Sequence, residues 1–129
     1  MKRTKKSSRS KLKKVLDTLC SKATRKKYPR CIVCGREDGL SAHHCIKPKG
    51  QTDGVRWLEF NLVSLCYNCH MNKVHGNQGD AVWMSKYLEI LHSLIPDYEW
   101  ENVVQIGNRP NKFSIADLKD LVVNGWWAK

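Results

Sequence analysis

The sequence predicts a small α+β protein in which a four-cysteine zinc site braces a central core and helices flank it. Three observations predict it: two Cys-x-x-Cys pairs in mid-chain, short strand-like segments between them, and apolar stripes of helical period on both sides. We therefore divide the 129 residues into a basic arm with a helix (1–29), a core (30–79) and a C-terminal helical extension (80–129). A chain of this length buries only about two thirds of its unfolded surface, so zinc would supply part of its stability.

The arm holds almost all of the net charge. Residues 1–30 contain 13 Lys or Arg and a single acid, Asp17, whereas the remaining 99 residues carry 10 basic and 11 acidic side chains. Such a block is typical of a polyanion-binding segment, and a solvated or targeting-like tail is the alternative. The residues predicted to contact DNA are Lys5, Lys6, Arg9, Lys13, Lys14, Lys22, Arg25, Lys26, Lys27 and, from the core, Arg56.

Residues 11–27 of the arm are expected to form a helix that begins at a Ser10 cap and stops before Pro29. Its apolar positions recur at helical spacing, so one face should dock on the core. These positions are Leu12, Val15, Leu16, Leu19, Cys20 and Ala23.

The two cysteine pairs are Cys31 with Cys34 and Cys66 with Cys69. A two-residue gap lets both thiolates of a pair reach one tetrahedral ion at about 2.3 Å, and four sulfur ligands favour zinc. The 31 residues between the pairs exceed the spacing of an ordinary zinc ribbon, which indicates an insert. A disulfide framework is the alternative, but no apolar signal segment follows Met1.

The insert contains the histidines. Residues 39–46 are predicted to form a strand ending at His43 and His44, residues 47–54 are rich in turn formers, and a second strand is predicted near 61–65. From residue 67 onward a short helix would carry His70 and stop at Gly76. In a strict strand His43 and His44 point to opposite faces, so both can act at one site only where the strand twists or ends.

The order His43-His44, Asn61 and His70, with the segment NLVSLCYNCH, resembles the HNH endonuclease family over about 45 residues. Members of that family have a ββα-metal core, and in many of them two Cys-x-x-Cys pairs brace it. Lys73 and the Gly-Asn step at Gly76 are further similar to small phage endonucleases, including recombination nucleases of the NinG/Rap type, which have Asn at the position of His70.

The resemblance implies hydrolysis of DNA phosphodiester bonds with one Mg²⁺ or Mn²⁺ ion. His44 would be the general base, His43 and His70 the metal ligands, and Asn61 a residue that orients the His44 ring through a hydrogen bond. His75 and Lys73 are further candidates for a metal or phosphate contact, although in a regular α-helix His75 would lie about 140° around from His70.

Two features complete the expectations for the core. Cys45 follows the histidine pair and could reach the same metal, but a lone strand cysteine is more often a small buried apolar residue. Trp57 could touch nucleic acid or belong to the core.

In the C-terminal extension, a helix should run from an Asp80 cap to Pro96, followed by an acidic, irregular stretch over 97–107. A capping box at Ser114 predicts a last helix that closes at Gly125. Trp126 and Trp127 would either pack back onto the domain or bind a partner. A protein partner or a homodimer through these helices is therefore a further expectation.

Taken together, these residues and the resemblance predict a cytoplasmic DNA endonuclease. The resemblance to phage enzymes further implies that it is phage-encoded and works in recombination, DNA processing or packaging, in which case its compartment is the cytoplasm of the bacterial host. No run of 18 apolar residues is present, so no membrane span is expected. One alternative is a non-catalytic zinc-finger DNA-binding protein. The other is an accessory protein whose cleavage is directed by a partner.

Overall fold

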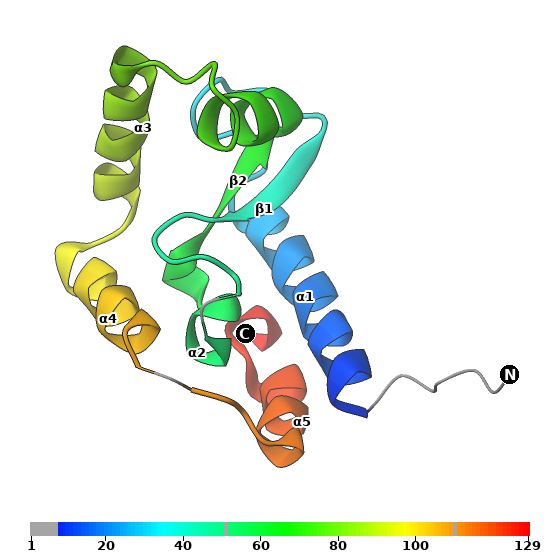
Figure 1. The fold of residues 1–129 in the computed structure, drawn as a ribbon. Coiled ribbons are helices and arrows are strands. Elements are labelled where there is room, and N and C mark those ends of the chain that lie inside the picture. Colours follow the sequence, from blue (N-terminus) through cyan, green and yellow to red (C-terminus); the bar gives the residue numbers. More distant parts are fainter. Residues whose placement is uncertain (1–7, 51, 110) are drawn as a thin grey trace, which may run out of the picture.

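The computed structural model describes residues 8–50, 52–109 and 111–129, so the predicted DNA contacts Lys5 and Lys6 lie outside the described residues. It combines helices with a two-stranded sheet, as the sequence predicts (Figure 1). The elements in chain order are α1 (Ser8–Lys27), β1 (Leu40–His44), α2 (Asp53–Arg56), η1 (Glu59–Asn61), β2 (Leu62–Cys66), the π-helix η2 (Asn68–Val74), α3 (Ala81–Leu94), α4 (Asp97–Gly107), α5 (Ile115–Asn124) and η3 (Trp126–Ala128).

The sheet lies at the centre, between α1 on one side and α3 on the other (Figure 1). β1 and β2 pair antiparallel, with Leu40 opposite Cys66 and His44 opposite Leu62. Both predicted strands are confirmed, with ends that differ by one or two residues. Every residue of β2 is buried, because one side of the sheet packs against α3 and the other against α1.

α1 docks on the domain, as its apolar stripe predicts. Leu16 and Cys20 are buried in a core shared with Trp57, Leu62 and Leu118. The buried stripe is rotated from the predicted one: it continues to Thr24, whereas Val15 is exposed. The helix begins at Ser8, so the expected Ser10 cap is wrong.

The C-terminal extension departs from expectation at one element. Residues 97–107 form the helix α4 instead of an irregular stretch. Asp97 and Glu99 lie in its first turn, where negative charge interacts favourably with the helix dipole, and Val103 is buried. The acidic residues that suggested a loop therefore stabilise the start of a helix.

The other two helices of the extension begin at the predicted caps. The Asp80 side chain accepts a hydrogen bond from Trp83 N at 2.8 Å, and Ser114 and Asp117 form the reciprocal capping box. Both terminal tryptophans pack back onto the domain, since Trp126 Nε1 donates to Trp57 O at 3.0 Å. None of the helices in the described ranges is long and apolar enough to span a membrane.

Candidate active site and metal centres

The four cysteines converge at one point. Their Sγ atoms all lie within 4.8 Å of one another, and Cys34 Sγ is 3.5 Å from Cys66 Sγ. Four sulfurs bonded tetrahedrally at about 2.3 Å would be about 3.8 Å apart, so the set closes around an ion with small shifts. The arrangement thus fits a structural metal ion such as zinc, as predicted from the spacing.

Local backbone geometry prepares this site. Gly35 adopts a φ of 78°, which favours glycine, and so lets the chain turn back directly after Cys34. Burial opposes ionisation of Cys31, but hydrogen bonds from backbone N–H groups lower the pKa of its thiol to about 7. A thiolate is the form that binds metal. The backbone N–H of Cys69 likewise points at Cys66 Sγ, at 3.5 Å.

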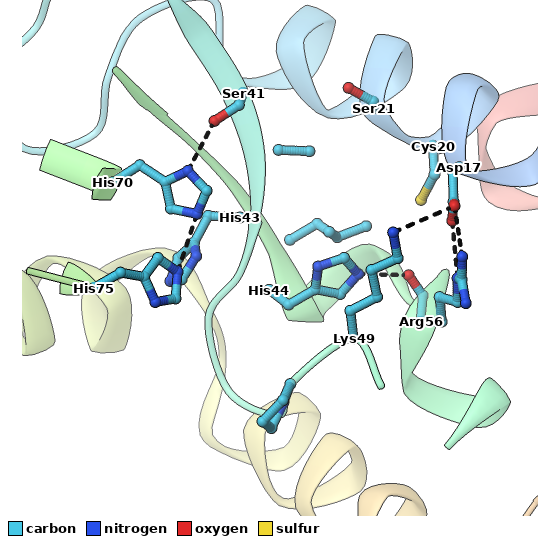
Figure 2. Close-up of a pocket in the computed structure, with 13 residues that line it drawn as sticks. Asp17, Cys20, Ser21, Ser41, His43, His44, Lys49, Arg56, His70 and His75 are labelled. Carbon is cyan, nitrogen blue, oxygen red and sulfur yellow. Dashed lines mark hydrogen bonds and ion pairs between the residues drawn. The ribbon is translucent and has the colours of Figure 1, made fainter. Parts of the chain in front are cut away.

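A second cluster contains three histidines. His43 comes from β1, and His70 and His75 come from η2 and the residue that ends it. One ring nitrogen of each lies within 4.8 Å of the others, and the Nε2 atoms of His70 and His75 are 3.1 Å apart (Figure 2). Three imidazoles in this arrangement are a ligand set for a divalent transition-metal ion.

The π-helix brings His75 to the cluster. His75 N donates to His70 O at 3.1 Å, an i→i+5 hydrogen bond that places residue 75 above residue 70. The separation of about 140° expected for a regular α-helix is therefore wrong for this segment. His75, a candidate from the sequence, lies beside His70, whereas the other candidate, Lys73, points its Nζ at Gln78 O, 3.2 Å away.

Ser41 orients His70 and was missed in the sequence. Its Oγ lies 3.2 Å from His70 Nδ1, and when it accepts that N–H, the Nε2 lone pair is free for a metal. Ser41 precedes His43 by two residues on the same strand and so shares its face, a period-2 signal that could have revealed it. Burial, with the neighbouring His70 and His75, lowers the pKa of His43 to about 3, and burial also lowers that of His70. Neutral rings are the form that binds metal.

His44 points away from the cluster, yet it lines the same pocket of about 430 Å³ as the three histidines. The side chains of His43 and His44 can line one pocket because the strand ends at His44. Its Nε2 is 2.8 Å from Arg56 O (Figure 2). A carbonyl only accepts, so Nε2 carries the proton, and in the neutral ring Nδ1 keeps a lone pair. Burial lowers the pKa of His44, although the Arg56 hydrogen bond opposes this.

Asn61 does not hold His44, so that prediction is wrong. It is fully buried, and backbone groups use its whole amide. Oδ1 accepts from Ile46 N and Lys47 N, both at 2.9 Å, while Nδ2 donates to Lys47 O at 2.9 Å and Val55 O at 3.0 Å. Asn61 therefore fixes the connection between the two strands, which supplies one wall of the pocket.

Four of the predicted DNA contacts are paired within the protein. Lys13 bonds Asp53 at 2.9 Å, Lys27 bonds Glu59 at 2.8 Å, Arg9 donates to Phe113 O, and Arg56 bonds Asp17. Four others lie exposed along α1: Lys14, Lys22, Arg25 and Lys26.

Three further residues near the pocket are placed by the structure. Trp57 is buried and belongs to the core. Cys45 is half-buried against the core beside α3, where burial raises the pKa of its thiol to about 12, and it belongs to neither metal cluster. Lys49 lines the pocket with its side chain half-exposed, and no motif in the sequence marks it.

Comparison of the chain with models of known protein families, with curated proteins and with solved structures finds no match. The resemblance to HNH endonucleases therefore depends on the quoted residues alone.

Proposed function

We propose that this chain is a metal-dependent DNA endonuclease of the HNH type. One observation carries the proposal: His44, whose Nδ1 has no hydrogen-bond partner among the described residues, shares a pocket with a three-histidine cluster. Phosphodiester hydrolysis requires a base for the attacking water and positive charge near the phosphate and the leaving oxygen. The pocket contains groups for both tasks.

The residues of the pocket divide this work. His44 Nδ1 accepts the proton of the attacking water, while its Nε2–H stays on the Arg56 carbonyl and keeps the ring in place. His43, His70 and His75 would hold a divalent cation, which when bound offsets the charge of the phosphate and the leaving oxygen. An all-imidazole set favours a first-row transition-metal ion over Mg²⁺, which prefers oxygen ligands. Of the two ions predicted from the sequence, Mn²⁺ therefore fits better.

Charge supports a nucleic acid as substrate. α1 forms one wall of the pocket through Asp17, Cys20 and Ser21. One turn further along the same helix, the exposed Arg25 lies against Ser21, because its Nε donates to Ser21 O at 3.3 Å. A phosphate held by Arg25 would lie at the edge of the pocket that contains His44, and a cation that neutralises a phosphate binds without regard to base sequence.

The test is cleavage of supercoiled plasmid by the full chain, with Mn²⁺, Ni²⁺, Mg²⁺ or no added metal. We expect metal-dependent nicking that His44→Ala lowers by at least about 100-fold, since general base catalysis contributes about 10²–10⁴-fold. His92→Ala is the matched control, because His92 is an exposed histidine on α3 that stacks on Trp100. Plasmid binding without cleavage under every metal would refute the proposal and favour the non-catalytic zinc-dependent DNA-binding protein.

A further inference from the structure

Asp17 is the only acidic residue among the first 30, in a segment with 13 cations. A single carboxylate in a segment that binds a polyanion weakens the binding of that polyanion. The contacts of Asp17 indicate another role for it. It lies on α1 at the edge of the pocket, within reach of the loop that carries the His44 acceptor (Figure 2).

Three hydrogen bonds hold the Asp17 carboxylate. Arg56 Nε donates to Oδ1 at 2.9 Å, Arg56 Nη2 donates to Oδ2 at 2.6 Å, and Trp57 Nε1 donates to Oδ1 at 2.9 Å. Burial alone would raise the pKa of Asp17, but these hydrogen bonds lower it, so the carboxylate is ionised at neutral pH. A two-pronged arginine–carboxylate pair is geometrically specific as well as strong.

The two side chains that Asp17 holds flank a single peptide unit, the one that contains Arg56 O. That oxygen is the acceptor of His44 Nε2 at 2.8 Å. α2, which ends at Arg56, has only four residues and cannot be stable by itself. The orientation of the Arg56 carbonyl therefore depends on contacts from outside the helix.

The neighbouring carbonyls are also held, each by a different part of the chain. Val55 O accepts from Asn61 Nδ2 at 3.0 Å, and Trp57 O accepts from Trp126 Nε1 at 3.0 Å. From α1, the element predicted to bind DNA, Asp17 accepts the hydrogen bonds of the Arg56 and Trp57 side chains. It connects the basic arm to His44 through one residue.

We propose, on the basis of the proposed function, that Asp17 is a positioning residue for His44, acting through the Arg56–Trp57 peptide. By fixing that peptide it keeps the His44 acceptor in place, and so keeps the proton on Nε2 and the lone pair on Nδ1. Loss of the carboxylate frees the carbonyl to rotate and allows the other tautomer.

The first experiment compares Asp17→Asn with Asp53→Asn in the zinc-loaded full chain. Asp53 is the matched control because its buried carboxylate also ties α1 to α2, through Lys13, but does not hold the Arg56–Trp57 peptide. For Asp17→Asn we expect kcat for plasmid cleavage to fall about 10- to 100-fold, as for other residues that orient an active-site ligand. KM should stay equal or decrease, because a negative charge leaves the DNA-binding face.

Asp53→Asn should leave kcat within about twofold while lowering stability. An Asp17→Asn enzyme with unchanged kcat, or a kcat loss of the same size in Asp53→Asn, would refute the inference. Arg56→Met removes the same contact from the other side, and the double variant with Asp17→Asn should lose no more rate than either single variant. If Asp17→Asn does not fold, the single variant Arg56→Met takes its place in the test.

A second readout needs no catalysis. Two-bond ¹H–¹⁵N correlation spectra report which imidazole nitrogen of His44 is protonated, with His44→Gln identifying the signal. The wild type and Asp53→Asn should show Nε2–H alone, and Asp17→Asn a mixture with Nδ1–H. An unchanged His44 signal in Asp17→Asn overturns the inference even if cleavage is confirmed. A changed signal in a protein that cuts no DNA leaves the positioning role standing and removes the proposed function.

Discussion

Replacing Asn61 with alanine tests whether this side chain pins the loop or orients His44. The amide makes four hydrogen bonds to backbone groups, none of them to His44. At about 1 kcal/mol net for each bond, Asn61→Ala would cost about 4 kcal/mol. Ile46 and Lys47 are only half-buried, so water can replace part of this, and we expect about 3 kcal/mol. For a domain of this size that corresponds to a fall in Tm of about 10 °C.

The assay is urea and thermal unfolding of the zinc-loaded protein. Asn124→Ala is the control, because Asn124 is an exposed asparagine with one side-chain bond to Asp120, and its loss should change stability by less than about 0.5 kcal/mol. Asn61→Asp should be as harmful as alanine, since a carboxylate would face the carbonyls of Lys47 and Val55. If Asn61→Ala retained wild-type stability and lost only cleavage, direct orientation of His44 would be the better account and this reasoning would be wrong.

The remaining predictions concern the metals, the arm and the core. EDTA should stop cleavage before it unfolds the protein, because three imidazoles hold an ion less tightly than four thiolates. Cys66→Ser should prevent zinc-dependent folding altogether. If EDTA removed cleavage and folding at the same concentration, the prediction of two separate metal sites would be wrong. His75→Ala should weaken binding of the second ion by at least about tenfold in a calorimetric titration, with zinc content unchanged by elemental analysis. Deleting residues 1–7 removes four positive charges. The slope of log affinity for duplex DNA against log salt concentration should then shrink by about 0.9 for each lost phosphate contact. An unchanged slope would mean that this segment does not touch DNA. Leu16→Ala should cost about 2–5 kcal/mol in urea unfolding, because Leu16 is fully buried in the core that α1 shares with α5; a loss below 1 kcal/mol would show that α1 is not essential to the fold.

The candidate residues that the sequence predicts are those whose chemistry depends on local spacing. The two Cys-x-x-Cys pairs predicted the tetracysteine cluster, and the order of His43, His44 and His70 predicted residues that line one pocket. The HNH family itself stays a prediction. Ser41 and Lys49 were not predicted from the sequence. Ser41 lies two residues before His43 on the same face of β1, but its contact with His70 depends on how η2 packs against the strand. Lys49 lies in a turn, where a single lysine forms no recognisable pattern.

The elements that the amino-acid order predicts are those with local signals: the capped helices α3 and α5, the two strands, and the two Cys-x-x-Cys pairs. Capping, hydrophobic period and ligand spacing act over a few residues and can be seen in the order of amino acids. Tertiary structure alone decided that Asn61 binds backbone, that Arg56 faces Asp17, and that η2 takes an i→i+5 hydrogen bond that brings His75 to His70. The bonds of Asn61 to Ile46 and Lys47, and that of Arg56 to Asp17, join groups 14 or more residues apart, and the η2 bond shifts a helical hydrogen bond by one residue. Such choices depend on which distant groups happen to be brought within hydrogen-bond distance once the core has packed, and local propensity does not contain that information.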